Sequence, residues 1–491
     1  MHIQRFKQES IIKKDSKAKT IEVNRSILGS LIAVSTRTGQ VIDFKKALTY
    51  PLSSVPLSLA NPDGTRRSTA KSKLQSIILD QSSVQISHPR KNSPDKSTVS
   101  AFLIDMMASI RTLKEIPDTY ELLTWKFIRS IPSGYDRIDI IADTYREVSI
   151  KTAERNKRGE SQRIMIQSEQ SKIPRNFQEF LKNGENKRRM ITLIFNVIAK
   201  DRIKALDLLH CNEILLSSDN ICTRVTDLTA TEEETLTSDQ QEADTKLILY
   251  CLHALSKDEN KKVIVRSPSA DIDVFVILLA KVESQHRVFL DFGVGMHRKG
   301  MYLHDIEMGT DQKKCLVGFH AFTGNDYISS FFQKGKGQCW RVVEKNRKFV
   351  TTFMRLGLMW DLTDQIFQEL EEYVCRLYGC RLRNIDDARH NIFEKKINKD
   401  GKVIDMALLP PCQSSLKLHS QRANVIAKIW NSADQRTCEL PALSNLGWTE
   451  DLQIKWIHFP FPAEVEEIFF DAEDDAFYGE EEESDEEDET D

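Results

Sequence analysis

One stretch, KKVIVRSPSADIDVFVILLAK at residues 261–281, constrains the fold more than any other. Its short apolar run at 263–265 predicts a buried parallel strand, and the apolar segment 274–280 predicts a helix that packs back on the sheet. Asp271 and Asp273 stand between the two. Carboxylates just past the carboxyl end of a strand lie where open α/β sheets place their ligand crevices. The pair is equally consistent with a helix cap and a first-turn acid, so the other acidic residues decide its interpretation.

Two earlier segments repeat this order of strand and acid. The apolar run at 100–104 ends in Asp105 and leads into a predicted helix. After another predicted helix at 120–131, a second strand at 137–143 ends in Asp143. This β–α–β alternation predicts an α/β domain with a mostly parallel central sheet.

The composition favours a soluble protein of a reducing compartment. Hydrophobic residues make up 40% of the 491 residues and charged residues 29%, which suffices for a large core. No apolar run is long enough to span a bilayer, and the basic N-terminus lacks the apolar region of a secretory signal. The nine cysteines are scattered without a CxxC pair, which argues against a disulfide framework or a zinc ribbon. We therefore expect an intracellular protein, nuclear or cytoplasmic, with no membrane contact.

The net charge of −4 hides an asymmetry between the body and the C-terminus. Residues 471–491 hold fourteen acidic residues and no Lys or Arg, so the rest of the chain carries +10. A basic body suits an anionic partner such as DNA or RNA, and a tail of this composition is predicted to be disordered.

Pattern and composition divide the chain into an N-terminal accessory region without a predicted role (1–95), an α/β domain (96–360), a helical C-terminal region (361–470) and the acidic tail. Within the α/β domain we expect a basic helical insertion at 144–235. Its basic residues include Lys151, Arg155, Lys157, Arg158, Arg163, Lys182, Lys187, Arg188 and Arg189. The insertion is either a solvated helical face or a phosphate-binding element, and its position directly after Asp143 favours the second.

Further acids start a helix or follow one. Glu242 and Asp244 lie in the first turn of a predicted helix at 241–250, and Gly324 has the position of a C′ glycine that ends a helix before Asp326. A parallel sheet would bring many of these carboxylates to one edge, where they cannot all stay ionised without cations. Oxygen ligands favour Mg²⁺ or Mn²⁺ over zinc, and two such ions about 4 Å apart would support phosphodiester hydrolysis.

The order of these motifs resembles the PIN-like nucleases, in particular the flap endonuclease and 5′-exonuclease branch. The resemblance covers about residues 101–357. It is carried by five short segments: FLID ending at Asp105, IIADTYREVSIK followed by ERNKR, EADT at Glu242, DID at Asp271, and GNDY ending at Tyr327. The chain is also similar to a broad group of animal proteins of mobile-element type. The family fold implies a three-layer domain around the parallel sheet.

The resemblance implies a role for each matched residue. The metal ligands would be Asp105, Asp143, Glu242, Asp244, Asp271, Asp273 and Asp326. Lys151 and Arg158 would contact the scissile phosphate as catalytic residues, and Arg155, Lys157, Lys334 and Lys336 would contact nucleic acid. The reaction would be structure-selective endo- or 5′-exonucleolytic cleavage of DNA or RNA, by a monomer with two divalent ions.

The chain departs from the family pattern in three places. Asp244 replaces the usual second Glu, the loop at 335–337 is not a clean helix-hairpin-helix, and about a hundred residues precede the first strand. Asp139 has no counterpart and is interpreted as structural or as support for the ligands. His320 is interpreted as a packed helix residue rather than a ligand.

Two other classes of function stay open from the sequence. One is a catalytically inactive PIN-like protein that binds nucleic acid or another partner. The other is a nucleotide-sugar transferase, in which Asp-x-Asp also follows a strand, although the chain lacks a Gly-rich nucleotide loop. Catalysis by Ser/His/Asp or Cys/His has no local signature in this chain.

Overall fold

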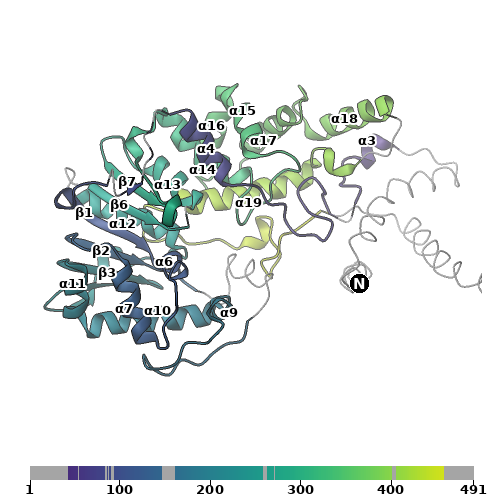
Figure 1. Ribbon diagram of the computed structural model, residues 1–491. Helices are drawn as coiled ribbons and strands as arrows, with labels where there is room; N and C mark the ends of the chain where they lie inside the picture. The colour runs from purple at the N-terminus through teal and green to yellow at the C-terminus, as the bar shows by residue number, and fades with distance from the viewer. Residues whose placement is uncertain are drawn as a thin grey trace, which may run out of the picture.

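The computed structural model describes residues 43–145, 161–257, 262–400 and 405–457, apart from 54, 83, 85, 87, 90–92 and 270. Within these residues, eight strands form one mixed sheet in the order β5-β4-β3-β2-β1-β6-β7-β8 (Figure 1). The strands are β1 (Val99–Asp105), β2 (Arg137–Ile141), β3 (Glu213–Ser218), β4 (Ile221–Val225), β5 (Ala230–Glu232), β6 (Lys262–Ser267), β7 (Arg287–Phe292) and β8 (Lys299–Tyr302).

The central five strands, β3-β2-β1-β6-β7, run parallel, and the outer pairings are antiparallel. From β1 the chain proceeds to β2 and β3 on one side, then returns to add β6 and β7 on the other. This reversal between β1 and β6 is a topological switch point, and open α/β sheets bind ligands at the carboxyl ends of the strands there. The predicted α/β class with a mostly parallel central sheet is confirmed.

The described part of the chain contains fifteen α-helices. They are α3 (Phe44–Ala47), α4 (Ser72–Asp80), α6 (Met106–Arg111), α7 (Tyr120–Ser130), α9 (Phe177–Phe180), α10 (Gly184–Lys200), α11 (Arg202–Leu209), α12 (Ala243–Lys257), α13 (Ile272–Lys281), α14 (Thr310–Phe322), α15 (Lys336–Glu344), α16 (Arg347–Arg355), α17 (Asp364–Leu377), α18 (Ile385–Asp400) and α19 (Gln413–Asn431). None of them is long and apolar enough to cross a membrane.

The two faces of the sheet bury different cores because side chains alternate along each strand. Leu103 and Val265 pack in a core with α12, α13 and α14, whereas Phe102, Ile104 and Ile264 pack in a second core with α7, α10 and α11. Figure 1 shows these two helix layers on opposite sides of the strands. Helices α16 and α19 pack on α14, and α4 packs on α13 and α15. Helix α4 of the N-terminal region therefore packs against the helices next to the sheet, whereas α3 packs on α18.

The apolar runs predicted the strands β1, β2 and β6 correctly, and the predicted helices after Asp105, at 120–131 and at 274–280 are α6, α7 and α13. The region 144–235 differs from the predicted helical insertion, because it contains β3, β4 and β5. The same region also holds two helices, α10 and α11, that meet at Asp201. Within the C-terminal region 361–470, the described residues form the helices α17, α18 and α19.

Candidate metal centre

Three carboxylates meet at the carboxyl edge of the sheet beside the switch point. Oxygens of Asp244, Asp271 and Asp273 lie within 4.8 Å of one another. Asp244 is in the first turn of α12, Asp271 is the N-cap of α13, and Asp273 is in the first turn of α13. Helix α13 begins here because the Asp271 side chain accepts a hydrogen bond from the amide of Asp273 at 3.1 Å. With Asp326, described below, these residues are called the acidic cluster.

Burial and mutual repulsion make ionisation of the pair on α13 costly. Burial and the charge of Asp273 raise the pKa of Asp271 to about 6, while Lys71 opposes the shift. Burial also raises the pKa of Asp273, whose residue is only 3% exposed, and Lys71 again opposes it. Two adjacent carboxylates with raised pKa values are a common feature of functional sites, and a bound cation would relieve the repulsion between them.

Asp273 is held by a chain of buried polar groups that reaches α15. Its Oδ1 lies 2.7 Å from Nε2 of His320, and Nδ1 of His320 lies 2.9 Å from Nζ of Lys336. Lys336 also donates to the carbonyl of His320 at 3.0 Å and to Thr323 Oγ1 at 2.8 Å. Since Lys336 donates to Nδ1, the neutral imidazole carries its proton on Nε2 and donates it to Asp273. Burial and the charge of Lys336 keep the pKa of His320 well below its ordinary value.

Lys71, which immediately precedes α4, reaches into the acidic cluster from the N-terminal region. Its Nζ lies 2.9 Å from Asp326 Oδ2, 3.3 Å from Asp273 Oδ2 and 3.9 Å from Asp271 Oδ1. Burial opposes the charged form, but the three carboxylates outweigh it and raise the pKa of Lys71. Lys71 is therefore a fixed cation of this site. Nothing in the sequence around Lys71 indicates this role.

Asp326 is positioned by the loop that follows α14. Gly324 has φ +109° directly after the C-cap residue Thr323, which confirms the predicted C′ glycine. The Asn325 side chain accepts hydrogen bonds from the amides of Tyr327 at 2.8 Å and Ile328 at 3.1 Å and shapes the turn. Asp326 is thereby presented beside Lys71, with half of its side chain exposed.

The other predicted ligands lie at neighbouring element ends. Asp143 accepts a hydrogen bond from the amide of Ala243 at 3.0 Å and so caps α12, directly beside Asp244. Glu242 accepts a hydrogen bond from the Tyr327 hydroxyl. Asp105 is the last residue of β1 and caps α6 by accepting a hydrogen bond from the amide of Ala108 at 2.9 Å. Its side chain lies on the same face of the sheet as that of Leu103. In the described residues, Asp244, Asp271 and Asp273 are the one group of three or more potential ligands close enough to share a metal ion, and Asp105, Asp143, Glu242 and Asp326 are not part of it.

Asp139 and His320 have the structural roles that the sequence suggested. Asp139 is fully buried and receives two hydrogen bonds from Arg137, at 2.8 and 2.7 Å. Burial raises the pKa of Asp139, and Arg137 opposes the shift. His320 is a packed residue of α14, as predicted, but it also orients Asp273, which the sequence did not indicate.

Two of the residues predicted to contact nucleic acid lie in the described part of the chain. The prediction for Lys336 is wrong, because this residue is 1% exposed and its ammonium group donates to three buried acceptors. Lys334 is partly buried with its Nζ 4.7 Å from the ring centroid of Tyr378. Burial lowers the pKa of Lys334. The remaining predicted residues, Lys151, Arg155, Lys157 and Arg158, lie outside the described residues.

The described basic residues near α10 are paired with an acid or buried. Arg163, Arg188 and Arg189 all pair with Glu185, at distances between 2.8 and 3.5 Å. Lys187 is 2% exposed and lies over the ring of Tyr145. This part of the region is an ion-pair network on a helix surface.

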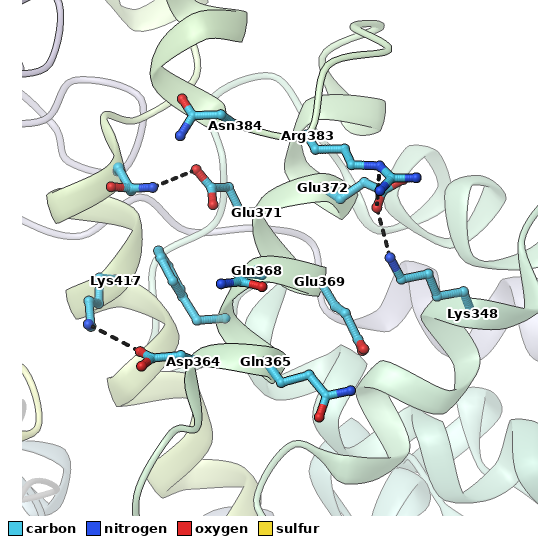
Figure 2. A pocket seen from close by; sticks show the side chains of 12 residues that line it. Lys348, Asp364, Gln365, Gln368, Glu369, Glu371, Glu372, Arg383, Asn384 and Lys417 are labelled. Carbon is cyan, nitrogen blue, oxygen red and sulfur yellow. Dashed lines mark hydrogen bonds and ion pairs between the residues drawn. The ribbon is translucent and has the colours of Figure 1, made fainter.

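A separate cavity of about 630 Å³ lies between α16, α17 and α19 (Figure 2). Figure 2 shows its charged side chains paired with each other, as in Lys417 with Asp364 and Lys348 with Glu372. None of its lining residues belongs to the acidic cluster. Its geometry therefore adds nothing to the candidate metal centre.

The residues of the acidic cluster fit a hard divalent cation. The donors are carboxylate oxygens, which suit Mg²⁺ or Mn²⁺ better than zinc, and those of the triad lie within 4.8 Å of one another. Among known proteins, the chain matches no family model and no curated protein. The case for a function therefore depends on the site itself.

Proposed function

We propose that this protein is a divalent-metal-dependent nuclease of the PIN-like class that hydrolyses phosphodiester bonds in DNA or RNA. The observation that carries the proposal is the convergence of Asp244, Asp271 and Asp273 at the switch point of a parallel sheet. Burial raises the pKa values of Asp271 and Asp273, and a divalent ion bound between these carboxylates would reduce the repulsion between them.

The residues of the chain have distinct tasks in this proposal. Asp244, Asp271 and Asp273 would hold Mg²⁺ or Mn²⁺, which when bound activates water and polarises the phosphodiester. His320 and Lys336 keep Asp273 in one orientation through buried hydrogen bonds. Lys151 and Arg158 remain the residues predicted to contact the scissile phosphate. A basic body with DNA or RNA as partner and an intracellular location complete the proposal.

A cleavage assay tests the proposal. Labelled flap duplex, single-stranded DNA and single-stranded RNA are incubated with purified protein in Mg²⁺, Mn²⁺ or EDTA. The test variant is Asp244→Asn/Asp271→Asn, which removes two charges while Asn can still cap α13. The control is Asp311→Asn. Asp311 is an exposed acid in the first turn of α14, at the end of this helix that lies away from Asp326.

We expect cleavage that EDTA abolishes, that falls at least about 100-fold in the double variant and that is unchanged in the control. Cleavage of equal rate in the double variant would refute the assignment of the acidic cluster. The preferred substrate of the panel would decide between DNA and RNA.

A second candidate function is a catalytically inactive PIN-like protein that binds nucleic acid or another partner. One observation favours it: Lys71 already neutralises part of the acidic cluster without a metal ion. Absence of cleavage by folded wild-type protein, together with equal nucleic-acid binding by wild type and the double variant, would support this second function.

A further inference from the structure

We propose that the ammonium group of Lys71 takes the place of one of the two cations expected at the acidic cluster, so that the protein binds one divalent ion per chain. The inference rests on the proposed metal-dependent function and adds the number of ions and the identity of the second cation.

The contacts of Lys71 are those of a bridging cation. Its Nζ joins Asp326 Oδ2, at 2.9 Å, to Asp273 Oδ2, at 3.3 Å, and lies 3.9 Å from Asp271 Oδ1. Asp273 and Asp326 come from α13 and from the loop after α14, so a positive charge between them holds two elements together. A second divalent ion at this position would have to displace the ammonium group.

The chain on both sides of Lys71 is fixed to the elements that carry these acids. Before it, the carbonyl of Arg67 accepts a hydrogen bond from the amide of Ser330 at 2.9 Å, and Arg66 donates to the carbonyl of Asn325 at 3.0 Å. After it, Leu74 and Ile78 of α4 are fully buried where α4 packs against α13 and α15. The backbone of Lys71 is thus held next to the elements that carry the acidic cluster.

Electrostatic repulsion also favours a single ion. The ammonium group of Lys71 lies between Asp273 and Asp326, so a second divalent ion bound by these two acids would lie within a few Å of it. The repulsion between two cations at that distance is strong because Lys71 and Asp273 are largely buried.

The experiment counts bound Mn²⁺ on the full chain by equilibrium dialysis with detection of free Mn²⁺ by electron paramagnetic resonance. The test variant is Lys71→Met, which keeps the length of the side chain and removes the charge. The matched control is Lys281→Met at the other end of α13, because Lys281 is also 20% exposed and also contacts an aspartate, Asp434, at 2.9 Å. Lys71→Arg tests whether charge alone suffices.

We expect one Mn²⁺ per chain for wild type, Lys281→Met and Lys71→Arg, and two for Lys71→Met. Two ions on the wild-type protein, or one ion on a folded Lys71→Met variant, would overturn the inference while leaving the metal centre in place. No Mn²⁺ on wild type or on either Met variant would refute the proposed metal centre itself, and the role of Lys71 with it. Thermal unfolding of each variant shows that the counts refer to folded protein.

Discussion

Replacing His320 with Leu tests the buried support of the acidic cluster most directly. His320 is fully buried, and it donates to the Asp273 carboxylate at 2.7 Å while it accepts from Lys336 at 2.9 Å. Leu fills a similar volume but offers no polar atom. The variant therefore leaves a buried carboxylate with one donor fewer and a buried ammonium with one acceptor fewer.

The magnitude follows from the kind of bond that is lost. A hydrogen bond to a charged group contributes about 1.5–3 kcal/mol, and breaking one partner of a buried charged network costs about 3–5 kcal/mol. His419 supplies the matched control, because it is also fully buried but its Nε2 donates only to a neutral carbonyl, that of Phe322, at 2.9 Å. His419→Leu should cost only about 1–2 kcal/mol.

Two measurements check this prediction. Urea unfolding of the metal-free proteins gives the free energy of unfolding, and calorimetric titration with Mn²⁺ gives the affinity. We expect His320→Leu to lose about 3–5 kcal/mol of stability and about 10–100-fold in Mn²⁺ affinity, and His419→Leu to keep wild-type affinity. If His320→Leu is no less stable than His419→Leu, Asp273 does not depend on the imidazole and the reasoning fails.

Three further predictions concern the rest of the fold. Arg137→Met should cost about 3–5 kcal/mol in urea unfolding, because it leaves Asp139 charged and fully buried, whereas Arg137→Met/Asp139→Leu should recover most of that loss. Burial lowers the pKa of His419 from 6.5 to about 3, so the unfolded chain binds one more proton between these values. Stability should therefore fall by up to about 1.4 kcal/mol per pH unit as the pH drops from 6.5 towards 3, and His419→Leu should lose this part of the slope. Gly324→Ala should destabilise the protein by about 1–3 kcal/mol and weaken Mn²⁺ binding in the calorimetric titration, because φ is +109° and the new Cβ would lie 2.9 Å from Ser330 Cβ; wild-type affinity would show that the loop does not position Asp326.

The parts of the fold that sequence predicted are those with strong local patterns. The strands β1, β2 and β6 are rich in apolar residues and end near an acid that precedes a helix or a loop, and burial of parallel strands on both faces requires such apolar segments. Strand β3 has an apolar run as long as that of β6, but it lies in a charged region that we interpreted as helical, and β4 has two exposed residues.

The acids of the site were accessible to sequence reasoning because each of them begins a helix or follows a strand. The cations were not. Lys71 lies 202 residues from Asp273 and 255 residues from Asp326 along the chain, and its neighbours carry no motif. Lys336 was assigned to nucleic-acid binding through the resemblance to the PIN-like nucleases, yet it is 1% exposed and donates to three acceptors. Long-range pairing of a buried charge leaves no periodic signal in the sequence.

These cations change how the candidate metal centre should respond to an ion. Asp273 receives one hydrogen bond from His320, 47 residues away, and one from Lys71, so its carboxylate is oriented before any ion binds. Lys71 in turn is fixed by α4 and by the segment that bonds Ser330. A ligand held in this way needs little rearrangement on binding, which favours affinity and geometric selectivity. Lys71, which belongs to the N-terminal region that the sequence left without a role, is therefore part of the candidate metal centre.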